Sequence, residues 1–234
     1  TILLNAPAHS TNPTLAKPNY DSIRDFAFIT LVAESQNLLV LHPSMPVHNV
    51  KELIAHARQR PKDINYGSSG AGSTPHLSAE LFQYMTGAKI THVPYKGSGA
   101  GMVALLSGEI SMYFANIPVA IPHVRNNRLR PVALSGTRRN QAVPGIPTLS
   151  ESGLPGFDVT SWFGIAAPAK TLRVIVDQLH GAIVRALQTP DLRARLLDQG
   201  AEPVGNTPEQ YTAFMQNEIA KWAKVIKAAG IKGG

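Results

Sequence analysis

The feature that most restricts the fold is an alternation of short strand-like and helical segments between residues 64 and 136. The strand-like runs lie at 64–66, 90–95, 110–114 and 129–134. Between them, apolar residues recur at helical spacing. The step from one strand to the next is roughly 20 to 25 residues, which is typical of a parallel sheet with helical crossovers. We therefore predict an α/β fold for this part of the chain.

Each predicted strand ends in a loop of small or polar residues. These loops are Gly67–Thr74, Lys96–Gly101, Asn116 and Ser135–Thr137. Because ligands of parallel α/β sheets bind beyond the carboxyl ends of the strands, the four loops are expected to line one pocket. In the first loop, Thr74 fits a helix N-cap and Pro75 the first helical position. Free N–H groups at the positive end of a helix suit a carboxylate, phosphate or sulfate, so we predict an anion-binding loop.

Composition narrows the function classes. The 234 residues suffice for one large or two modest domains. The net charge of +7 comes from 22 Lys+Arg against 15 Asp+Glu, and the basic residues are scattered. An anionic small ligand explains this bias at least as well as nucleic acid does, so we expect no nucleic-acid partner. The absence of cysteine excludes disulfides and thiol chemistry.

Tests for catalytic motifs are negative. Gly67–Thr74 has the glycine spacing of a P-loop, but Ser73 stands where the phosphate-binding lysine should be. The glycines from Gly97 to Gly101 lack the dinucleotide spacing, and no G-x-S-x-G elbow occurs. The histidines show no zinc pattern, and no pair of carboxylates stands out as an acid and a base. We expect a binding protein without enzymatic activity, metal or cofactor.

The sequence also predicts the secondary structure of several other segments. Residues 5–13 are predicted to form a turn-rich loop, and 23–32 and 38–41 two separate strands. After Pro168 the pattern is helical only, with a capping box that begins at Thr207. For three residues, the sequence leaves a packing or solvated role open beside a ligand-binding role. They are His76, Lys96 and Trp162.

Six segments, taken together, resemble a known family. They are Asn65–Phe82, His92–Ser98, Leu106–Ile110, Pro147–Gly156, Ser161–Pro168 and Gly200–Gly205. In sequence and in order they are similar to the Bug/TctC solute receptors of tripartite tricarboxylate transporters. The resemblance implies a periplasmic, two-lobed type II binding protein with parallel-rich sheets flanked by helices. It implies a small mono- or dicarboxylate ligand and a membrane permease as partner.

The resemblance also implies lobe boundaries and site residues. The first lobe would comprise 1–34 and 160–234, and the second 35–159. In the second lobe, ligand contacts are assigned to Ser68, Ser69, Gly70, Ala71, Gly72, Ser73, Thr74, Tyr95, Lys96, Gly97, Ser98 and Asn116. In the first lobe and near the returning hinge, they are assigned to Ala8, His9, Ser10, Ser161 and Trp162.

The chain departs from the family pattern in two places. Family members have a strand, a Pro/Gly-rich loop, a helix and a second strand before the point where this chain starts. From this we expect an incomplete first lobe, with weaker binding or oligomers formed by segment swapping. Ala115 stands where an Asp is frequent, which favours a plain carboxylate over an amino acid. Two alternatives remain: an α/β enzyme for a small phosphorylated or carboxylated substrate, and a sensory or interaction domain without a transport role.

Overall fold

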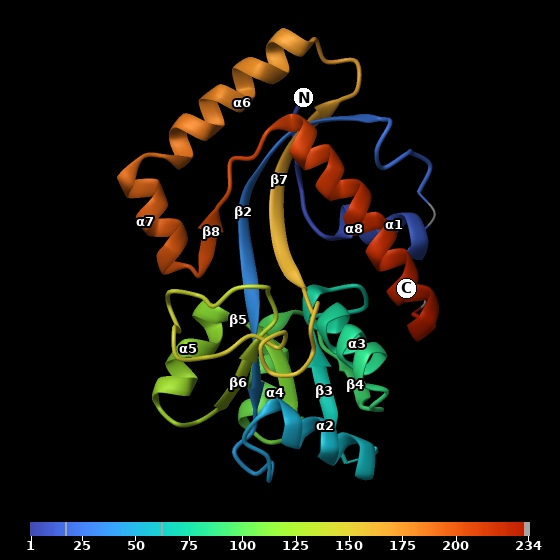
Figure 1. The fold of residues 1–234 in the computed structure, drawn as a ribbon, viewed down its shortest axis with the longest axis vertical. Coiled ribbons are helices and arrows are strands. Elements are labelled where there is room, and N and C mark those ends of the chain that lie inside the picture. The colour runs from blue at the N-terminus through green and yellow to red at the C-terminus, as the bar shows by residue number, and fades with distance from the viewer. Residues whose placement is uncertain (17, 62, 232–234) are drawn as a thin grey trace. The chain divides into compact units, whose positions relative to one another are not determined.

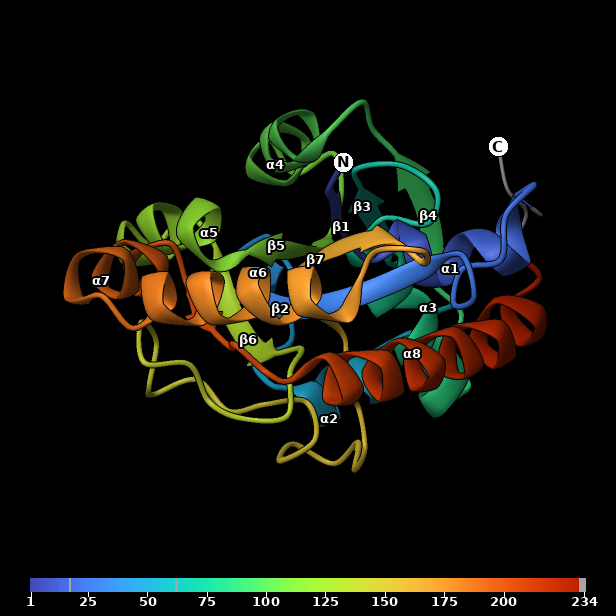
Figure 2. The same cartoon turned by 90° about the horizontal axis from the view of Figure 1, so that it is seen from above.

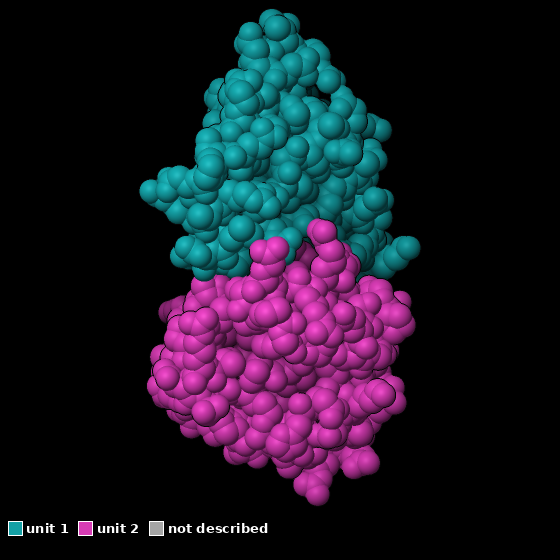
Figure 3. All heavy atoms as spheres, turned by 60° about the vertical axis from the view of Figure 1, so that its left-hand side comes forward, with its two compact units in different colours: residues 1–35, 161–234 teal, residues 36–160 magenta. Residues whose placement is uncertain are grey.

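A computed structural model of the chain describes residues 1–16, 18–61 and 63–231. The structure divides into two compact units, coloured separately in Figure 3. Unit 1 comprises residues 1–35 and 161–234, and unit 2 comprises residues 36–160. The chain passes from one unit to the other within strand β2 (Phe26–Leu41) and again at the start of strand β7 (Thr160–Pro168).

Unit 2 is built on a mixed sheet with strand order β4–β3–β5–β2–β6. The strands beside β2 are β3 (Asn65–Ser68), β4 (Thr91–Pro94), β5 (Met112–Asn116) and β6 (Arg130–Leu134). Strand β3 is parallel to β4 and β5, while β5 and β6 both run antiparallel to β2. Strands β3 to β6 therefore point the same way, as the sequence predicts. The antiparallel β2 makes the sheet mixed instead of fully parallel.

The helices of unit 2 begin where its strands end. Helices α3 (Thr74–Thr86), α4 (Ser98–Leu106) and α5 (Ile117–Arg125) follow β3, β4 and β5 along the chain, and α2 (Val50–Gln59) follows β2 (Figure 1). The N-cap of α3 is Ser73, so the prediction of Thr74 as the cap is wrong by one residue. Thr74 takes the first helical position and Pro75 the second, where its missing N–H leaves no intrahelical bond unmade.

Unit 1 contains the strand order β1–β7–β2–β8, with β1 at Leu3–Asn5 and β8 at Ala201–Pro203. Its helices are α1 (Ala8–Leu15), α6 (Arg173–Leu187), α7 (Pro190–Asp198) and α8 (Pro208–Ala229). Helix α8 packs against α1 (Figures 1 and 2), and α7 packs against β8 (Figure 1). The capping box predicted at Thr207 is confirmed. Among the described residues, every helix is too short or too polar to cross a membrane.

Three further predictions of local structure are wrong. The region after Pro168, expected to be helical only, contains strand β8, because Ala201–Pro203 pairs with Ala33–Ser35 of β2. The two separate strands expected at 23–32 and 38–41 form one strand, β2. The polar residues between them stay extended because Glu34 and Ser35 pair with β8 and Asn37 pairs with β5. The loop expected at 5–13 is largely helix α1. Its Pro13 sits inside this short helix, where local sequence disfavours the helical state, so packing of α1 against α8 decides its conformation.

Two glycines of unit 2 are needed for close packing around Tyr113 of β5. A Cβ atom on Gly101 would lie 2.6 Å from a ring carbon of Tyr113, and one on Gly67 would lie 2.8 Å from another. Both distances are shorter than a carbon–carbon contact allows. Gly67 and Gly101 belong to the glycine-rich motifs of the sequence, yet they serve the fold by letting α4 and β3 approach this ring.

We expect Gly101→Ala to lower the free energy of unfolding by about 1–3 kcal/mol, because the added methyl group overpacks the Tyr113 ring. Gly99 lies in the same helix, and a Cβ atom there would meet no other side chain within 4 Å, so Gly99→Ala is the matched control. It should be neutral or slightly stabilising, because alanine favours the helix. Urea denaturation of both variants measures the difference, and equal effects would contradict the packing role of Gly101.

Candidate functional site

The four predicted loops meet at one edge of the unit 2 sheet. The Tyr95 N–H donates to the Ser68 carbonyl oxygen at 3.0 Å, which joins the ends of β4 and β3. At the other side, Asn37 of β2 pairs with Asn116 of β5, and the Ser135 N–H donates to the Asn37 carbonyl oxygen at 2.9 Å. The carboxyl ends of β3, β4, β5 and β6 therefore form a continuous row, as expected for a ligand edge.

In the loop after β3, backbone N–H groups that form intramolecular hydrogen bonds alternate with N–H groups that form none among the described residues. Gly70 and Gly72 have φ angles of 120° and 74°, which glycine adopts without strain. The Gly70 N–H donates to Ser68 Oγ at 3.1 Å and the Gly72 N–H to His76 Nδ1 at 3.0 Å. Within the described part of the chain, the N–H groups of Ser69 and Ala71 make no intramolecular hydrogen bond. Ala71 is exposed and Ser69 half-buried.

Ser73 forms hydrogen bonds within the loop, so its side chain is not free to bind a ligand. Its N–H and its hydroxyl both donate to the Gly70 carbonyl oxygen, at 3.2 and 2.7 Å. Ser68 is fully buried, and its hydroxyl lies 2.7 Å from His92 Nε2. Of the predicted contact residues in this loop, Ser68 and Ser73 therefore shape the turn through their side chains. Ser69 and Ala71 are the ones with N–H groups left for a ligand.

The loop after β4 supplies a second helix N-terminus. Gly97, with φ 95°, is the N-cap of α4, and Ser98 is the first helical residue. Lys96, Gly97 and Ser98 are exposed. The Tyr95 hydroxyl donates to Glu109 Oε1 at 2.8 Å, and partial burial together with this carboxylate raises the pKa of Tyr95 to about 12. Tyr95 thus contributes its backbone to this edge, while its ring is engaged with Glu109.

Two residues of β2 that are absent from the predicted contact set, Gln36 and Asn37, also lie at this edge, beside Ser135 of the predicted loop that follows β6. Ser135 is buried, and its hydroxyl accepts the Asn37 N–H at 2.9 Å and donates to the Val159 carbonyl oxygen at 2.6 Å. Among the described residues, Asn37 Oδ1 and Gln36 Oε1 are buried without a hydrogen-bond partner. Two adjacent amides inside the apolar run of β2 are the signal in the sequence that could have identified these positions.

The electrostatics of the edge favour an anion. Helices α3, α4 and α5 all begin there, and each N-terminus carries a partial positive charge from its aligned peptide dipoles. The loop segments 67–74, 95–101 and 135–137 contain no Asp or Glu, and Lys96 adds a full positive charge. Backbone N–H groups at such helix ends bind carboxylates and phosphates directly.

The predicted contacts of the first lobe lie inside unit 1. His9 and Ser10 are buried in α1, where His9 Nε2 lies 2.8 Å from the Ser22 carbonyl oxygen and the Ser10 hydroxyl donates to the Pro7 carbonyl oxygen at 2.8 Å. The His9 ring meets Phe26 edge-on at 4.6 Å, and burial lowers its pKa. Ala8 is exposed. The side chains of His9 and Ser10 are therefore core groups of unit 1.

Trp162 and Ser161 lie in β7. The Trp162 ring is fully buried in the core of unit 1, edge-on to Phe214 at 5.5 Å. Its indole N–H donates to the buried Glu218 at 3.3 Å, and the same carboxylate oxygen accepts the Trp222 indole N–H at 2.8 Å. Ser161 is buried as well. The packing role left open for Trp162 by the sequence is the one seen in the structure.

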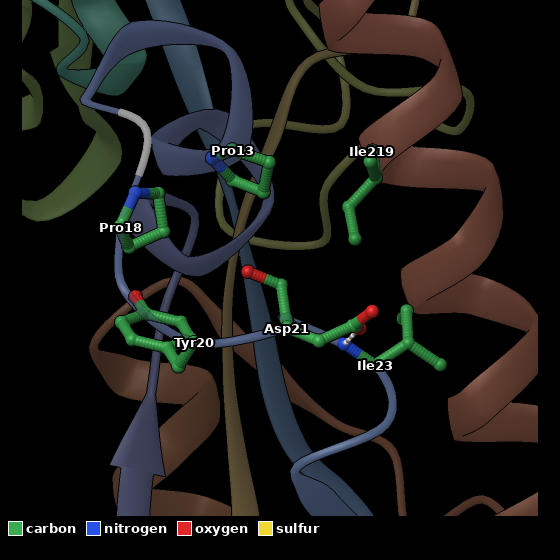
Figure 4. A pocket seen from close by; sticks show the side chains of 7 residues that line it. Pro13, Pro18, Tyr20, Asp21, Ile23 and Ile219 are labelled. Atoms are coloured by element: carbon green, nitrogen blue, oxygen red, sulfur yellow. Dashed lines mark hydrogen bonds between the residues drawn. The ribbon is translucent and has the colours of Figure 1, made fainter.

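Unit 1 also contains a hollow of about 310 Å³ between α1, the segment after it and α8 (Figure 4). Pro13, Pro18, Tyr20 and Ile219 line it, together with Asp21. The Asp21 carboxylate already accepts the N–H groups of Ile23 and Arg24, and its negative charge opposes a second carboxylate. The described residues contain no group of three or more His, Asp or Glu side chains arranged for a metal ion.

Comparison with known proteins places these features in a family. A profile of the tripartite tricarboxylate transporter family receptor, TctC, matches residues 1–231. Protein BugT of Bordetella pertussis is 35% identical over 91% of this chain. The chain spans 65% of the length of BugT, and 62% and 66% of two further relatives, from a Pseudomonas strain and Cupriavidus necator.

Solved structures agree with the profile. A Rhodopseudomonas palustris protein, Rpa4515 with adipate, is 37% identical with a TM-score of 0.86, and the match covers 100% of this chain and 79% of that one. MatC from the same species, with bound malate, is 30% identical with a TM-score of 0.81 over 97% of this chain and 79% of that one. The α/β fold class predicted from the sequence is confirmed by these matches. The chain belongs to the tripartite tricarboxylate transporter receptor family, TctC.

Proposed function

We propose that this protein is a non-enzymatic receptor that captures a small mono- or dicarboxylate in the periplasm for a membrane permease. The observation that carries the proposal is the row of loops at the carboxyl edge of unit 2. There, the free N–H groups of Ser69 and Ala71 lie in the turn that precedes α3, and α4 and α5 begin at the same edge. Together with Lys96, these groups complement one carboxylate.

The relatives support this choice of ligand class. Rpa4515 and MatC, which are similar to this chain over nearly all of its length, are described with adipate and with malate. Both ligands are small dicarboxylates. At the edge of β5, Ala115 precedes Asn116, so this position offers no carboxylate to pair with a ligand ammonium group. A plain organic acid therefore fits this chain better than an amino acid does.

Two other functions are weaker. An α/β enzyme acting on a phosphorylated or carboxylated substrate needs an acid and a base at the site. The loop segments 67–74, 95–101 and 135–137 contain no Asp, Glu or His, and the Tyr95 hydroxyl is already bonded to Glu109. An interaction domain without a small ligand leaves the free N–H groups of the Ser69–Ala71 segment unexplained.

The formation of oligomers by exchange of a segment between two copies stays a prediction. Light scattering coupled to size-exclusion chromatography measures the oligomeric state that tests it.

A thermal-shift screen of the protein against organic acids tests the proposal. Adipate and malate head the panel, with inorganic phosphate, glutamate and uncharged diamides of the same length as comparison ligands. A receptor for plain carboxylates gains stability from at least one dicarboxylate in proportion to the logarithm of its concentration, and none from the diamides. No stabilisation by any carboxylate, or stabilisation by phosphate alone, would contradict the proposal.

Gly70→Ala should weaken binding of the dicarboxylate found in that screen by about tenfold or more. The φ angle of 120° at Gly70 strains any residue with a Cβ, so the N–H groups on either side of it lose their orientation. The matched control is Gly87→Ala, with φ 66° at the far end of α3, about 20 Å away along a 13-residue helix. Both variants should lose about 1–2 kcal/mol of stability, and only Gly70→Ala should lose affinity.

Lys96→Gln should weaken the same ligand by about threefold at low salt, because an exposed charge contributes little and is screened. The difference should vanish near about 0.5 M NaCl. Lys89→Gln is the control, since Lys89 is also exposed but precedes β4, whereas Lys96 follows it. Calorimetric titration at both salt concentrations gives the comparison. An unchanged affinity in Lys96→Gln would remove Lys96 from the site.

A further inference from the structure

A stack of three rings lies directly beneath the ligand loop of unit 2. The His76 and His92 rings are nearly parallel, with centroids 4.2 Å apart and an interplanar angle of 10°. The Tyr66 ring also stacks on His92, with centroids 4.8 Å apart, and its centroid lies 6.4 Å from that of His76. His76 comes from α3, His92 from β4 and Tyr66 from β3. The stack therefore joins three elements whose ends carry the loops of the candidate site.

The two histidines hold the two loop glycines that have positive φ angles. His76 Nδ1 accepts the Gly72 N–H directly, at 3.0 Å. His92 acts through Ser68, because its Nε2 lies 2.7 Å from the Ser68 Oγ that accepts the Gly70 N–H. The N–H groups between and before these glycines, those of Ala71 and Ser69, are the ones left free. Along the loop, the N–H groups fixed by the histidine pair (Gly70 and Gly72) therefore alternate with the N–H groups available to a ligand (Ser69 and Ala71).

These hydrogen bonds assign a proton to His76. Because Nδ1 accepts an N–H, it carries no proton, and a neutral imidazole must then be protonated at Nε2. Nε2 faces Glu80 Oε1 at 3.7 Å, which is too long for a hydrogen bond. The same Glu80 oxygen accepts the Tyr66 hydroxyl at 2.6 Å and the Gln83 side-chain amide at 2.8 Å. Glu80 is thus satisfied without His76 becoming charged.

We infer that His76 and His92 are positioning residues of the ligand loop, and that they hold it in its anion-binding form only while His76 is neutral. This inference rests on the proposed function, since it names what orients the groups that bind the carboxylate. Protonation of Nδ1 would turn the acceptor of the Gly72 N–H into a second donor. The two groups would then repel each other, and the turn between Gly70 and Gly72 would lose one of its two attachments to the stack.

The surroundings keep His76 neutral over the range in which a periplasmic receptor works. Burial, with the neighbouring His92 ring as a second cause, lowers the pKa of His76 from 6.5 to about 4. Burial also lowers the pKa of His92 and raises those of Tyr66 and of Glu80, which accepts the Tyr66 hydroxyl. An unfolded His76 takes up its proton at higher pH than the folded one. The neutral histidine therefore favours the folded form fully above about pH 6.5, and this contribution falls as the pH drops toward 4.

Nuclear magnetic resonance of the ligand-free, ¹⁵N-labelled protein tests the geometry without requiring a ligand. We expect the His76 ring nitrogens at pH 7 to show the Nε2–H tautomer. The Gly72 amide should shift in a transition with a midpoint near 4, while core amides such as that of Leu38 stay unchanged. In His76→Asn, whose side-chain oxygen replaces Nδ1 as acceptor and does not titrate, this transition should be absent. A protonated Nδ1 at pH 7, or the same Gly72 transition in His76→Asn, would overturn the inference.

Affinity for adipate at pH 7 supplies the second measurement. His76→Leu, which removes the acceptor, should bind adipate about tenfold more weakly than the unaltered protein, whereas His76→Asn should stay within about threefold. His48→Asn is the matched control, because His48 is exposed and precedes α2. Equal affinity of His76→Leu and the unaltered protein would overturn the inference. Failure of every variant and of the unaltered protein to bind any dicarboxylate counts against the proposed function, and the resonance data still decide the role of the stack.

Discussion

The antiparallel pairing of β2 with both β5 and β6 is the interaction on which the candidate site depends. Residues Leu38–Leu41 bond to β5 on one side and to β6 on the other, so these two strands are forced to point the same way. Strand β3 extends that direction through its parallel pairing with β5, and β4 extends it through β3. Four strand ends, and the helices that follow three of them, consequently meet at one edge. The position of the candidate site is therefore set by the direction of the strands, independently of the side chains found there.

The glycines near this edge perform two different physical tasks. Gly70, Gly72 and Gly97 have positive φ angles and create the turns that precede α3 and α4. Gly67 and Gly101 have no such angles and instead give the Tyr113 ring room to pack between β3 and α4. Among the residues that the structure describes, the buried Tyr113 hydroxyl beside Ser69 has no hydrogen bond of good geometry, and burial raises the pKa of Tyr113 to about 12. A rigid, neutral ring therefore supports the loop from below, and the turns above it determine which N–H groups are exposed.

The histidines that support the ligand loop are neutral, whereas the helix N-termini and Lys96 make the edge of the sheet positive. His76 and His92 are uncharged at neutral pH. His76 accepts a hydrogen bond from the Gly72 N–H, and His92 is hydrogen-bonded to the Ser68 hydroxyl. In the proposed site, the attraction for an anion comes from helix dipoles and one exposed lysine, so the protein buries no charge of its own there. Under the proposed function, such a site binds a carboxylate through preorganised dipoles, which fits a receptor that has to release its ligand again.

The sequence by itself determined the α/β class, the parallel direction of β3 to β6, and the loops that end these strands, because hydrophobic period, glycine position and element spacing are local properties. It also located the turn at Gly70–Gly72. Only the tertiary structure decided that residues 26–41 form one strand, that His9 and Trp162 are core groups of unit 1, and that Asn37 lies opposite Asn116. It alone decided that His76 and His92 stack beneath the loop. These outcomes depend on contacts between residues far apart along the chain, and such contacts leave no periodic signal in the sequence.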